Sequence, residues 1–256
     1  MKLNIGYFYP KELNLYGDTG NVEILMYRAK KRGIPVELYN ITSETKLTSH
    51  LMHNLNLIFM GGGPDSGQKV MYKDLIDNKG PYLKDFIENQ GSSLFICGSY
   101  QLMGHYYKSA DGSELKGLGI FDHYTEHFGH SKQRCVGNVV CKLEDTLLND
   151  STFKSINKVG PNIVGFENHG GCTYLNKNLK PLAKIISGFG NNGEDDTEGA
   201  FYKSSLGTYF HGPILSKNPH IADFLIAKAL KISELSNIDD NIIMKAHSAL
   251  IKRFSN

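Results

Sequence analysis

The chain has 256 residues, of which 40% are hydrophobic, so it can bury a sizeable core. Its 28 basic and 26 acidic residues are dispersed and give a formal net charge of +2, which provides no basic stripe for nucleic acid. No apolar stretch approaches the ~20 residues that a membrane helix requires. The N-terminus lacks the pattern of a signal peptide. We therefore expect no nucleic-acid partner and no membrane insertion.

The cysteines point to a reducing compartment. They lack C-x-x-C spacing, and a chain of this size does not need disulfides for stability. We therefore expect reduced thiols in a cytoplasmic protein at Cys97, Cys135, Cys141 and Cys172. Because no repeat and no linker interrupts the sequence, we expect a single domain over residues 1–256.

The first hundred residues predict strands that alternate with helices. Apolar residues at helical spacing between residues 22 and 29 predict a helix, which Asp18 or Thr19 is expected to cap. Pro81 begins another helix. The expected strands cover residues 2–9, 36–41, 55–60 and 94–96. This order is typical of a mainly parallel sheet with helices on both faces.

Short strands and loops dominate from residue 117 to residue 209. Strands are expected over residues 136–143, 162–166, 182–189 and 200–202, and another strand leads to His211 at a Gly-Pro turn. Two helices follow, one starting near Asn218 and one over residues 239–254. We predict an α/β fold with a mainly parallel central sheet, flanking helices and additional short strands in the second half.

Cys97 follows the strand at residues 94–96 and precedes the small residues Gly98 and Ser99. A nucleophile-type residue on a tight turn between a strand and a helix forms a nucleophile elbow. The elbow directs the side chain towards the positive end of the next helix, where a thiolate is stabilised. A single cysteine after a strand is commonly an inert core residue, but the glycine-rich turn favours a nucleophile.

Gly61, Gly62 and Gly63 follow another strand end. Their N–H groups can form a nest for an anion or an oxyanion, and the alternative is a flexible turn. No Gly-Lys-Ser/Thr follows and no G-x-G-x-x-G is present, so nucleotide binding is disfavoured. Because the carboxyl ends of parallel strands meet at one edge, we expect this turn to lie near Cys97.

A catalytic thiol needs a base within hydrogen-bond reach, usually a histidine. We favour His211, because it ends a strand at a turn that exposes its side chain. His169, with Glu167 and Asn168 beside it, is the alternative.

The remaining histidines give weaker patterns. A loose cluster lacks regular ligand spacing, so we expect no metal site at His123, His127 and His130. Four others are expected at the surface: His50, His53, His220 and His247.

Several motifs resemble one known family. Ile-Cys97-Gly-Ser-Tyr-Gln101 is similar to the nucleophile motif of class I glutamine amidotransferases, in particular their cobyric-acid-synthase-like branch. Within that branch, four further motifs resemble the glutaminase subunits of lipid II isoglutaminyl synthases: Leu-Tyr-Gly-Asp-Thr-Gly-Asn21, Gly61-Gly-Gly-Pro-Asp65, Gly165-Phe-Glu-Asn-His-Gly-Gly171 and Thr208-Tyr-Phe-His-Gly-Pro-Ile214. The resemblance covers residues 13 to about 225.

The resemblance implies a flavodoxin-like glutamine amidotransferase domain that hydrolyses L-glutamine. Cys97 would attack the side-chain amide, and His211 would carry the protons. The oxyanion would be held by backbone N–H groups of Gly62, Gly63 and Gly98.

Two further residues belong to the implied substrate site. Arg134 matches the family arginine that binds substrate, and its guanidinium suits the α-carboxylate of glutamine. Gln101 lies four residues after the cysteine in the nucleophile motif. No cofactor is implied for this chain.

The resemblance also implies a partner. Ammonia would pass within a heterodimer to a Mur-ligase-like synthetase subunit, which uses ATP and Mg to amidate the D-glutamate of the lipid II stem peptide. The pair would act at the inner face of the membrane. Two alternatives stay open: an amidotransferase subunit with another acceptor, such as cobyrinate, and a non-catalytic subunit that stabilises its ligase.

Three residues depart from the family pattern. Ser99 replaces the usual glycine and would be strained if the turn needs a positive φ there. Pro213 stands where class I enzymes carry the glutamate of the catalytic triad, and the resemblance implies an acid from the ligase partner. Cys172 stands where an arginine is expected in close relatives.

Overall fold

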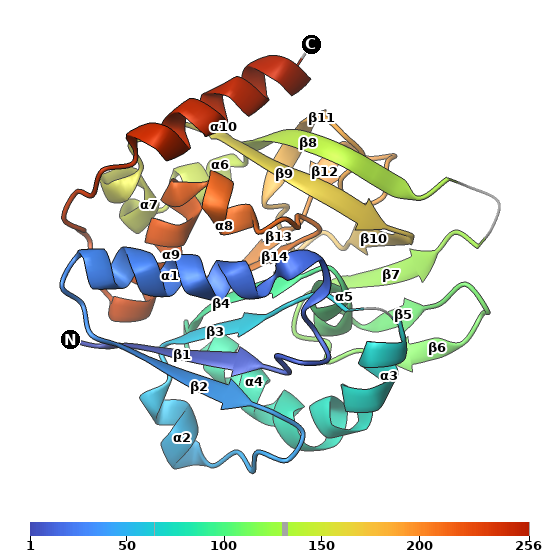
Figure 1. Cartoon of the computed structure of the whole chain (residues 1–256). Coiled ribbons are helices and arrows are strands. Elements are labelled where there is room, and N and C mark those ends of the chain that lie inside the picture. The colour runs from blue at the N-terminus through green and yellow to red at the C-terminus, as the bar shows by residue number, and fades with distance from the viewer. Residues whose placement is uncertain (64, 130–132, 256) are drawn as a thin grey trace.

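A six-stranded sheet forms the centre of the computed structural model (Figure 1). The structure describes residues 1–63, 65–129 and 133–255, apart from the side chains of residues 65–69. The strand order is β13-β14-β4-β3-β1-β2, and only the edge strand β13 runs antiparallel to its neighbour. The strands are β1 (Leu3–Phe8), β2 (Val36–Ile41), β3 (Leu57–Met60), β4 (Ser92–Ile96), β13 (Ala200–Tyr202) and β14 (Ser205–Thr208).

Helices cover both faces of this sheet. Every residue of β3 and β4 is buried, as expected for parallel strands that are packed on two sides. Figure 1 shows α1 (Thr19–Lys31) and α9 (Pro219–Leu230) on one face and α2 (Ser49–Asn54) with α4 (Gly80–Glu88) on the other. The remaining helices are η1 (Leu15–Gly17), α3 (Asp65–Asp74), η2 (Leu75–Lys79), α5 (Gly98–Met103), α6 (Asp145–Leu148), α7 (Ser151–Ile156), α8 (Ile214–Lys217) and α10 (Asn241–Phe254).

Two four-stranded sheets extend the fold beyond the carboxyl ends of the central strands. Their orders are β10-β7-β5-β6 and β12-β11-β8-β9. The strands are β5 (Tyr106–Lys108), β6 (Glu114–Lys116), β7 (His123–His127), β8 (Cys135–Leu143), β9 (Asn162–His169), β10 (Gly171–Leu175), β11 (Ala183–Ser187) and β12 (Thr197–Glu198). The predicted α/β class, with its mainly parallel sheet and later short strands, is therefore confirmed.

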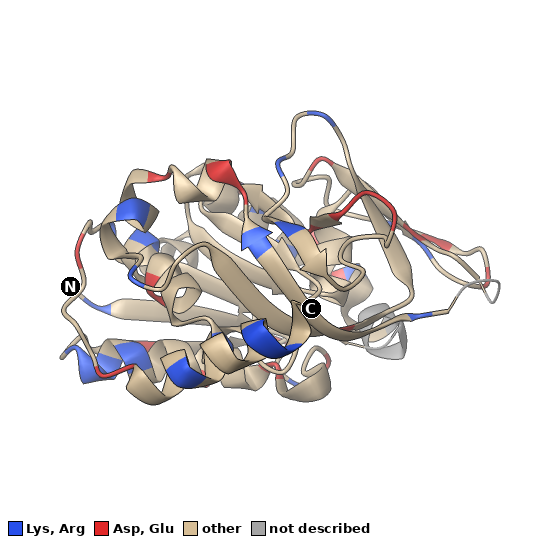
Figure 2. Cartoon of the chain, turned by 90° about the horizontal axis from the view of Figure 1, so that it is seen from above, with Lys and Arg blue, Asp and Glu red and all other residues tan. Residues whose placement is uncertain are grey.

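Several local expectations are wrong. The strand that leads to His211 ends at Thr208, and His211 itself forms an isolated bridge with Phe166. His220 and His247 are only 2% exposed, because their rings contact each other at 5.7 Å between centroids and Nδ1 of His247 bonds the Lys217 carbonyl. No helix in the described ranges is long and apolar enough to cross a membrane. In Figure 2 the Lys and Arg residues are scattered among Asp and Glu, as in the sequence.

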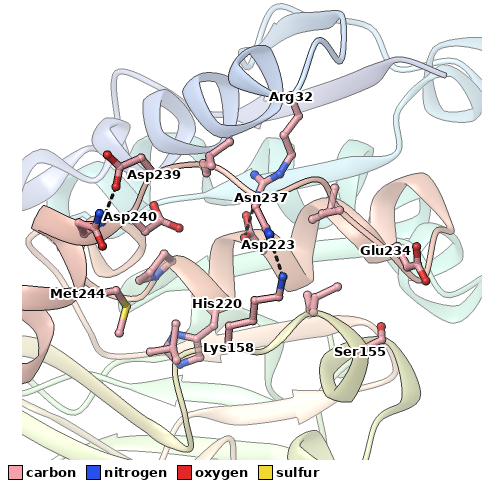
Figure 3. A pocket seen from close by; sticks show the side chains of 16 residues that line it. Arg32, Ser155, Lys158, His220, Asp223, Glu234, Asn237, Asp239, Asp240 and Met244 are labelled. Atoms are coloured by element: carbon pink, nitrogen blue, oxygen red, sulfur yellow. Dashed lines mark hydrogen bonds and ion pairs between the residues drawn. The ribbon is translucent and has the colours of Figure 1, made fainter.

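Arg28, a buried arginine of α1, forms ion pairs with the C-terminal segment. Arg28 is 1% exposed and forms two bidentate pairs, with Asp223 on α9 and with Asp240 just before α10, at N–O distances of 2.7 to 2.8 Å. Arg32 adds a third bond to Asp223. A cavity of about 830 Å³ lies beside this network, and Figure 3 shows His220 at its wall. The pairing compensates the buried charges.

Glu198 is a buried carboxyl group of β12. It accepts hydrogen bonds from the Thr208 hydroxyl and the Tyr209 N–H. Burial raises the pKa of Glu198 to about 8, and the nearby Glu167 also raises it, against the effect of these hydrogen bonds. The folded chain therefore retains a proton on Glu198 at pH values where the unfolded chain has released it.

We predict that Glu198→Gln gains stability relative to the unchanged protein as pH rises from about 5 to 8. Over this window the unchanged protein binds the extra proton only when folded, so its free energy of unfolding loses up to about 1.4 kcal/mol for each pH unit. Glutamine carries no such proton. Denaturant unfolding at several pH values measures the difference, with the exposed Glu23→Gln as control. A difference that is flat with pH would contradict a neutral Glu198.

Candidate active site

A cavity of about 420 Å³ opens at the carboxyl edge of the central sheet. The loops after β1, β3 and β4 contribute to it, and so do β9 and β10. Its lining residues are Leu15, Tyr16, Gly63, Cys97, Gln101, Tyr107, His127, Arg134, Asn168, His169, Gly170 and Gly171. The fold thus brings Cys97 together with both predicted substrate residues, Gln101 and Arg134.

Cys97 sits in a strained turn between β4 and α5. Its φ of 50° and ψ of −106° lie outside the regions that non-glycine residues favour, at a typical cost of about 1–3 kcal/mol. The Cys97 N–H donates to the Thr208 carbonyl at 2.8 Å, which ties the turn to β14. Gly98 is the first residue of α5, so its N–H has no acceptor within the helix. The side chain is 8% exposed.

Ser99 braces this turn instead of straining it. The positive φ falls on Cys97, while Ser99 lies inside α5. The Ser99 hydroxyl accepts from the Ile96 N–H at 2.9 Å and donates to the Met60 carbonyl at 2.7 Å. It therefore joins the ends of β3 and β4 beneath the cysteine. The condition for strain at Ser99 is not met, because the turn has its positive φ two residues earlier, at Cys97.

Gly62 allows the close approach of three groups. A Cβ atom there would lie 2.8 Å from Cε1 of His211 and 3.1 Å from Cβ of Cys97. Its N–H donates to Oδ2 of Asp18 at 2.7 Å. The Gly62 N–H thus already has an acceptor in this structure. Gly63, which lines the cavity, and Gly98 are the other two predicted backbone donors at this edge.

His211 is fully buried beside Cys97 and Asp18. Its Nδ1 lies 3.1 Å from Oδ1 of Asp18, which is also fully buried. Burial alone lowers the pKa of His211, but the hydrogen bond with Asp18 and the nearby Cys97 outweigh this effect and raise the pKa to about 10, although Nε2 has no hydrogen-bond partner among the described residues. Because Asp18 takes Nδ1, Nε2 is the ring nitrogen left to exchange a proton with Cys97.

Asp18 is the residue that the sequence did not reveal as part of the site. It precedes α1 as expected, but its side chain makes no capping hydrogen bond to that helix. Its carboxylate instead spans the Gly62 N–H and the His211 ring. The structure therefore places Asp18, an acid of this chain, at Nδ1 of His211. The resemblance implied that an acid of the partner subunit would take this position.

The loop around Asp18 is fitted to the turn after His211. A Cβ atom at Gly20 would lie 2.6 Å from Cγ of Pro213, so only glycine fits there. Oδ1 of Asn21 accepts from the Leu215 N–H at 3.0 Å. Pro213, at the place of the usual family glutamate, is thus a packing surface for this loop. The shared motif Leu-Tyr-Gly-Asp-Thr-Gly-Asn contained the signal for Asp18.

His169 lines the cavity but is held in another way. Its ring stacks on Tyr209 at 3.7 Å between centroids, and its Nδ1 bonds the Gly171 carbonyl at 2.8 Å. Glu167, which accepts from two backbone N–H groups at residues 189 and 190, lies 3.7 Å from Nε2. The carboxylate of Glu167 is therefore held by the backbone of the loop after β11 and lies beside His169.

The two predicted substrate residues occupy different depths. Gln101 is 4% exposed and donates to the Tyr209 hydroxyl at 3.1 Å. Arg134 is exposed at the rim, where its Nε and Nη2 donate to Oδ1 of Asn168 at 3.3 and 3.1 Å. Nη1 is the guanidinium nitrogen that does not bond Asn168.

The remaining sequence expectations concern cysteines and metals. Cys172 is buried in β10, and its thiol contacts the Asn192 carbonyl at 3.7 Å. His123 is fully buried, and burial lowers its pKa to about 3. His130 of the loose histidine cluster and Pro64 of the glycine motif lie outside the described residues. Within the described part, no three His, Cys, Asp or Glu side chains form a group that could hold a metal ion.

Comparisons with known proteins identify the family of the chain. Residues 4–219 match the model of the CobB/CobQ-like glutamine amidotransferase domain. The chain therefore belongs to this glutamine amidotransferase family.

Two curated relatives of this amidotransferase align with most of the chain. One is the Staphylococcus aureus lipid II isoglutaminyl synthase (glutamine-hydrolyzing) subunit GatD, which is 41% identical over 98% of this chain and 96% of its own length. The other is the Streptococcus pneumoniae subunit of that name, 37% identical over 90% of this chain and 81% of its own. The predicted resemblance to these subunits is confirmed.

Solved structures support the fold of the amidotransferase. PurLQS from Thermotoga maritima superposes with a TM-score of 0.60 over 90% of this chain and 99% of that chain, at 14% identity. At this identity the likeness concerns the fold alone.

The Asp18 contact predicts a shift of the His211 titration. Asp18→Asn replaces the carboxylate by an uncharged group of similar shape, so we expect the pKa of His211 to fall by about 1 to 3. NMR titration of the His211 ring measures it. Asp122→Asn, which removes the carboxylate beside the distant His105, is the matched control. An unchanged His211 titration in Asp18→Asn would contradict the contact.

Proposed function

We propose that this chain is the glutaminase subunit of a lipid II isoglutaminyl synthase. It hydrolyses L-glutamine to glutamate and ammonia and passes the ammonia to a Mur-ligase-like partner. The observation that carries the proposal is the line from Asp18 through His211 to Cys97 at the edge of the same cavity as Arg134. A nucleophile, its base and the acid that orients the base are the parts of a hydrolytic triad.

The first half-reaction forms a thioester. The proton of the Cys97 thiol resides on Nε2 of His211, whose raised pKa favours the charged ring, and the Cys97 sulfur attacks the side-chain amide carbon of glutamine. The tetrahedral intermediate collapses when the imidazolium returns that proton to the amide nitrogen, which leaves as ammonia. The product is a γ-glutamyl thioester on Cys97.

The second half-reaction releases glutamate. His211 accepts a proton from water, and the resulting hydroxide attacks the thioester carbon. Collapse of this intermediate breaks the carbon–sulfur bond, and His211 returns the proton to the thiolate. Asp18 stabilises the imidazolium that forms in both halves. The raised pKa of His211 agrees with this role, since it favours the charged ring next to the carboxylate.

Backbone N–H groups stabilise the oxyanion of both intermediates. We assign this role to Gly98 and Gly63, which lie at the start of α5 and at the cavity wall. The Gly62 N–H donates to Asp18 at the same edge of the sheet. Arg134 binds the α-carboxylate of glutamine through its guanidinium, whose Nη1 does not bond Asn168, and Gln101 closes the inner end of the substrate site.

The acceptor and the partner come from the relatives' name. A glutamine-hydrolysing subunit of a lipid II isoglutaminyl synthase needs a synthetase subunit, which we propose to be Mur-ligase-like and to form a heterodimer with this chain. ATP and Mg belong to that subunit, and this chain uses no cofactor. The heterodimer would amidate the D-glutamate of lipid II at the inner face of the membrane.

His211 and His169 are distinguished by alanine substitution. We expect His211→Ala to lower ammonia release from glutamine by about 10²-fold or more, because the base and acid of both half-reactions are lost. His169→Ala should retain measurable hydrolysis, since Glu167 and Tyr209 hold this ring in a structural role. Thermal unfolding of each variant controls for folding. The reverse ranking would overturn the assignment of the base.

The proposed acceptor is tested with amide-¹⁵N glutamine. The chain, its Mur-ligase-like partner, ATP and Mg should place the ¹⁵N label on the D-glutamate of lipid II, as detected by mass spectrometry. Cys97→Ala should fail with glutamine and recover with ammonium salt, because the ligase still accepts ammonia directly. Ammonia release without labelled lipid II under these conditions would leave the glutaminase standing and reject lipid II as acceptor.

A further inference from the structure

Tyr16 occupies an unusual place over the buried histidine. It lies in η1 with a φ of 55°, and its side chain is 44% exposed although it contacts the fully buried His211. The two rings meet edge to face, with 4.9 Å between centroids and 72° between planes. A non-glycine residue held at positive φ costs roughly 1–3 kcal/mol, so other contacts must hold Tyr16 there.

One such contact links Tyr16 to the substrate arginine. The Asn168 side-chain N–H donates to the Tyr16 hydroxyl at 2.7 Å. The side-chain oxygen of Asn168 accepts from two nitrogens of Arg134, and its backbone carbonyl accepts from Nη2 at 3.3 Å. Asn168 is therefore held from both sides, by Arg134 and by Tyr16.

The four residues form one continuous path at the cavity. They come from η1, the segment before β8, β9 and the loop after β14, which are far apart in the sequence. Arg134 at the rim reaches His211 through two intermediates, Asn168 and Tyr16. An exposed arginine has many rotamers, and fixing one of them before substrate arrives lowers the entropic cost of binding.

We propose that Tyr16 is a positioning residue with two separate effects. Its hydroxyl, through Asn168, holds the Arg134 guanidinium in the orientation that receives the α-carboxylate of glutamine. Its ring holds the imidazole of His211 against Asp18. This inference rests on the proposed glutaminase function and extends it to a residue outside the triad.

The two effects predict different kinetics for two variants. Tyr16→Phe removes only the hydroxyl, so KM for glutamine should rise about three- to tenfold while kcat and the His211 titration stay unchanged. Tyr16→Ala removes the ring as well, so kcat should also fall and the His211 titration should shift. Asn168→Ala should raise KM as Tyr16→Phe does. The double variant Tyr16→Phe/Asn168→Ala should have a KM no higher than that of either single variant.

The experiment measures steady-state ammonia release and the NMR titration of His211 in the full chain, with its ligase partner present in the kinetic assay. Tyr27→Phe, at an exposed tyrosine of α1, is the matched control.

Labelling of Cys97 by a glutamine-like diazo ketone in the unchanged protein tests the glutaminase function separately. If Cys97 is labelled but Tyr16→Phe matches Tyr27→Phe in KM, the inference is wrong. If Cys97 is not labelled, the proposed function itself fails. Should Tyr16→Ala not fold, Tyr16→Phe and Asn168→Ala carry the test.

Discussion

The Asp18 carboxylate holds together three loops that the chain supplies far apart in sequence. It follows β1, accepts a hydrogen bond from the Gly62 N–H after β3, and contacts His211 after β14. Asp18, Gly62 and His211 are all buried, so these contacts stabilise the carboxylate in place of water. The parallel register of the sheet makes this possible, because it brings the carboxyl ends of β1, β3 and β14 to one edge.

The site has a buried part, which contains Asp18, His211 and Cys97, and an exposed part, which contains Arg134. Asp18 and His211 are fully buried and Cys97 nearly so, which strengthens the electrostatic coupling between them. Arg134 lies at the rim, where a carboxylate from solvent can reach it without entering the core. The same cavity joins both parts. Under the proposed function, this separation would let the chain bind glutamine by its charged end and expose only the amide end to the thiol.

Much of the site was predictable because strand ends are local signals. The apolar run before Cys97 and the glycines after β3 both indicated the carboxyl edge of a parallel sheet. Asp18 was not predictable in this way, because an aspartate before a helix has the pattern of a cap and its real partners are 44 and 193 residues away. The backbone conformation of the elbow was also not predictable: Cys97 itself carries the positive φ, and Ser99 bonds two strand ends. Burial of His220 and His247 depended on how the C-terminal helices pack, which periodicity does not specify.

Arg28 sets a limit on how short this protein can be. The family domain ends at residue 219, yet both acids that neutralise the buried Arg28 lie beyond that point. A chain cut at the domain boundary would lose both counter-charges of Arg28 together with α9, which packs on α1. Since α1 begins directly after Asp18, the tail is linked to the position of the catalytic loop. Sequence change in this distant tail is therefore constrained by the site at the opposite end of α1.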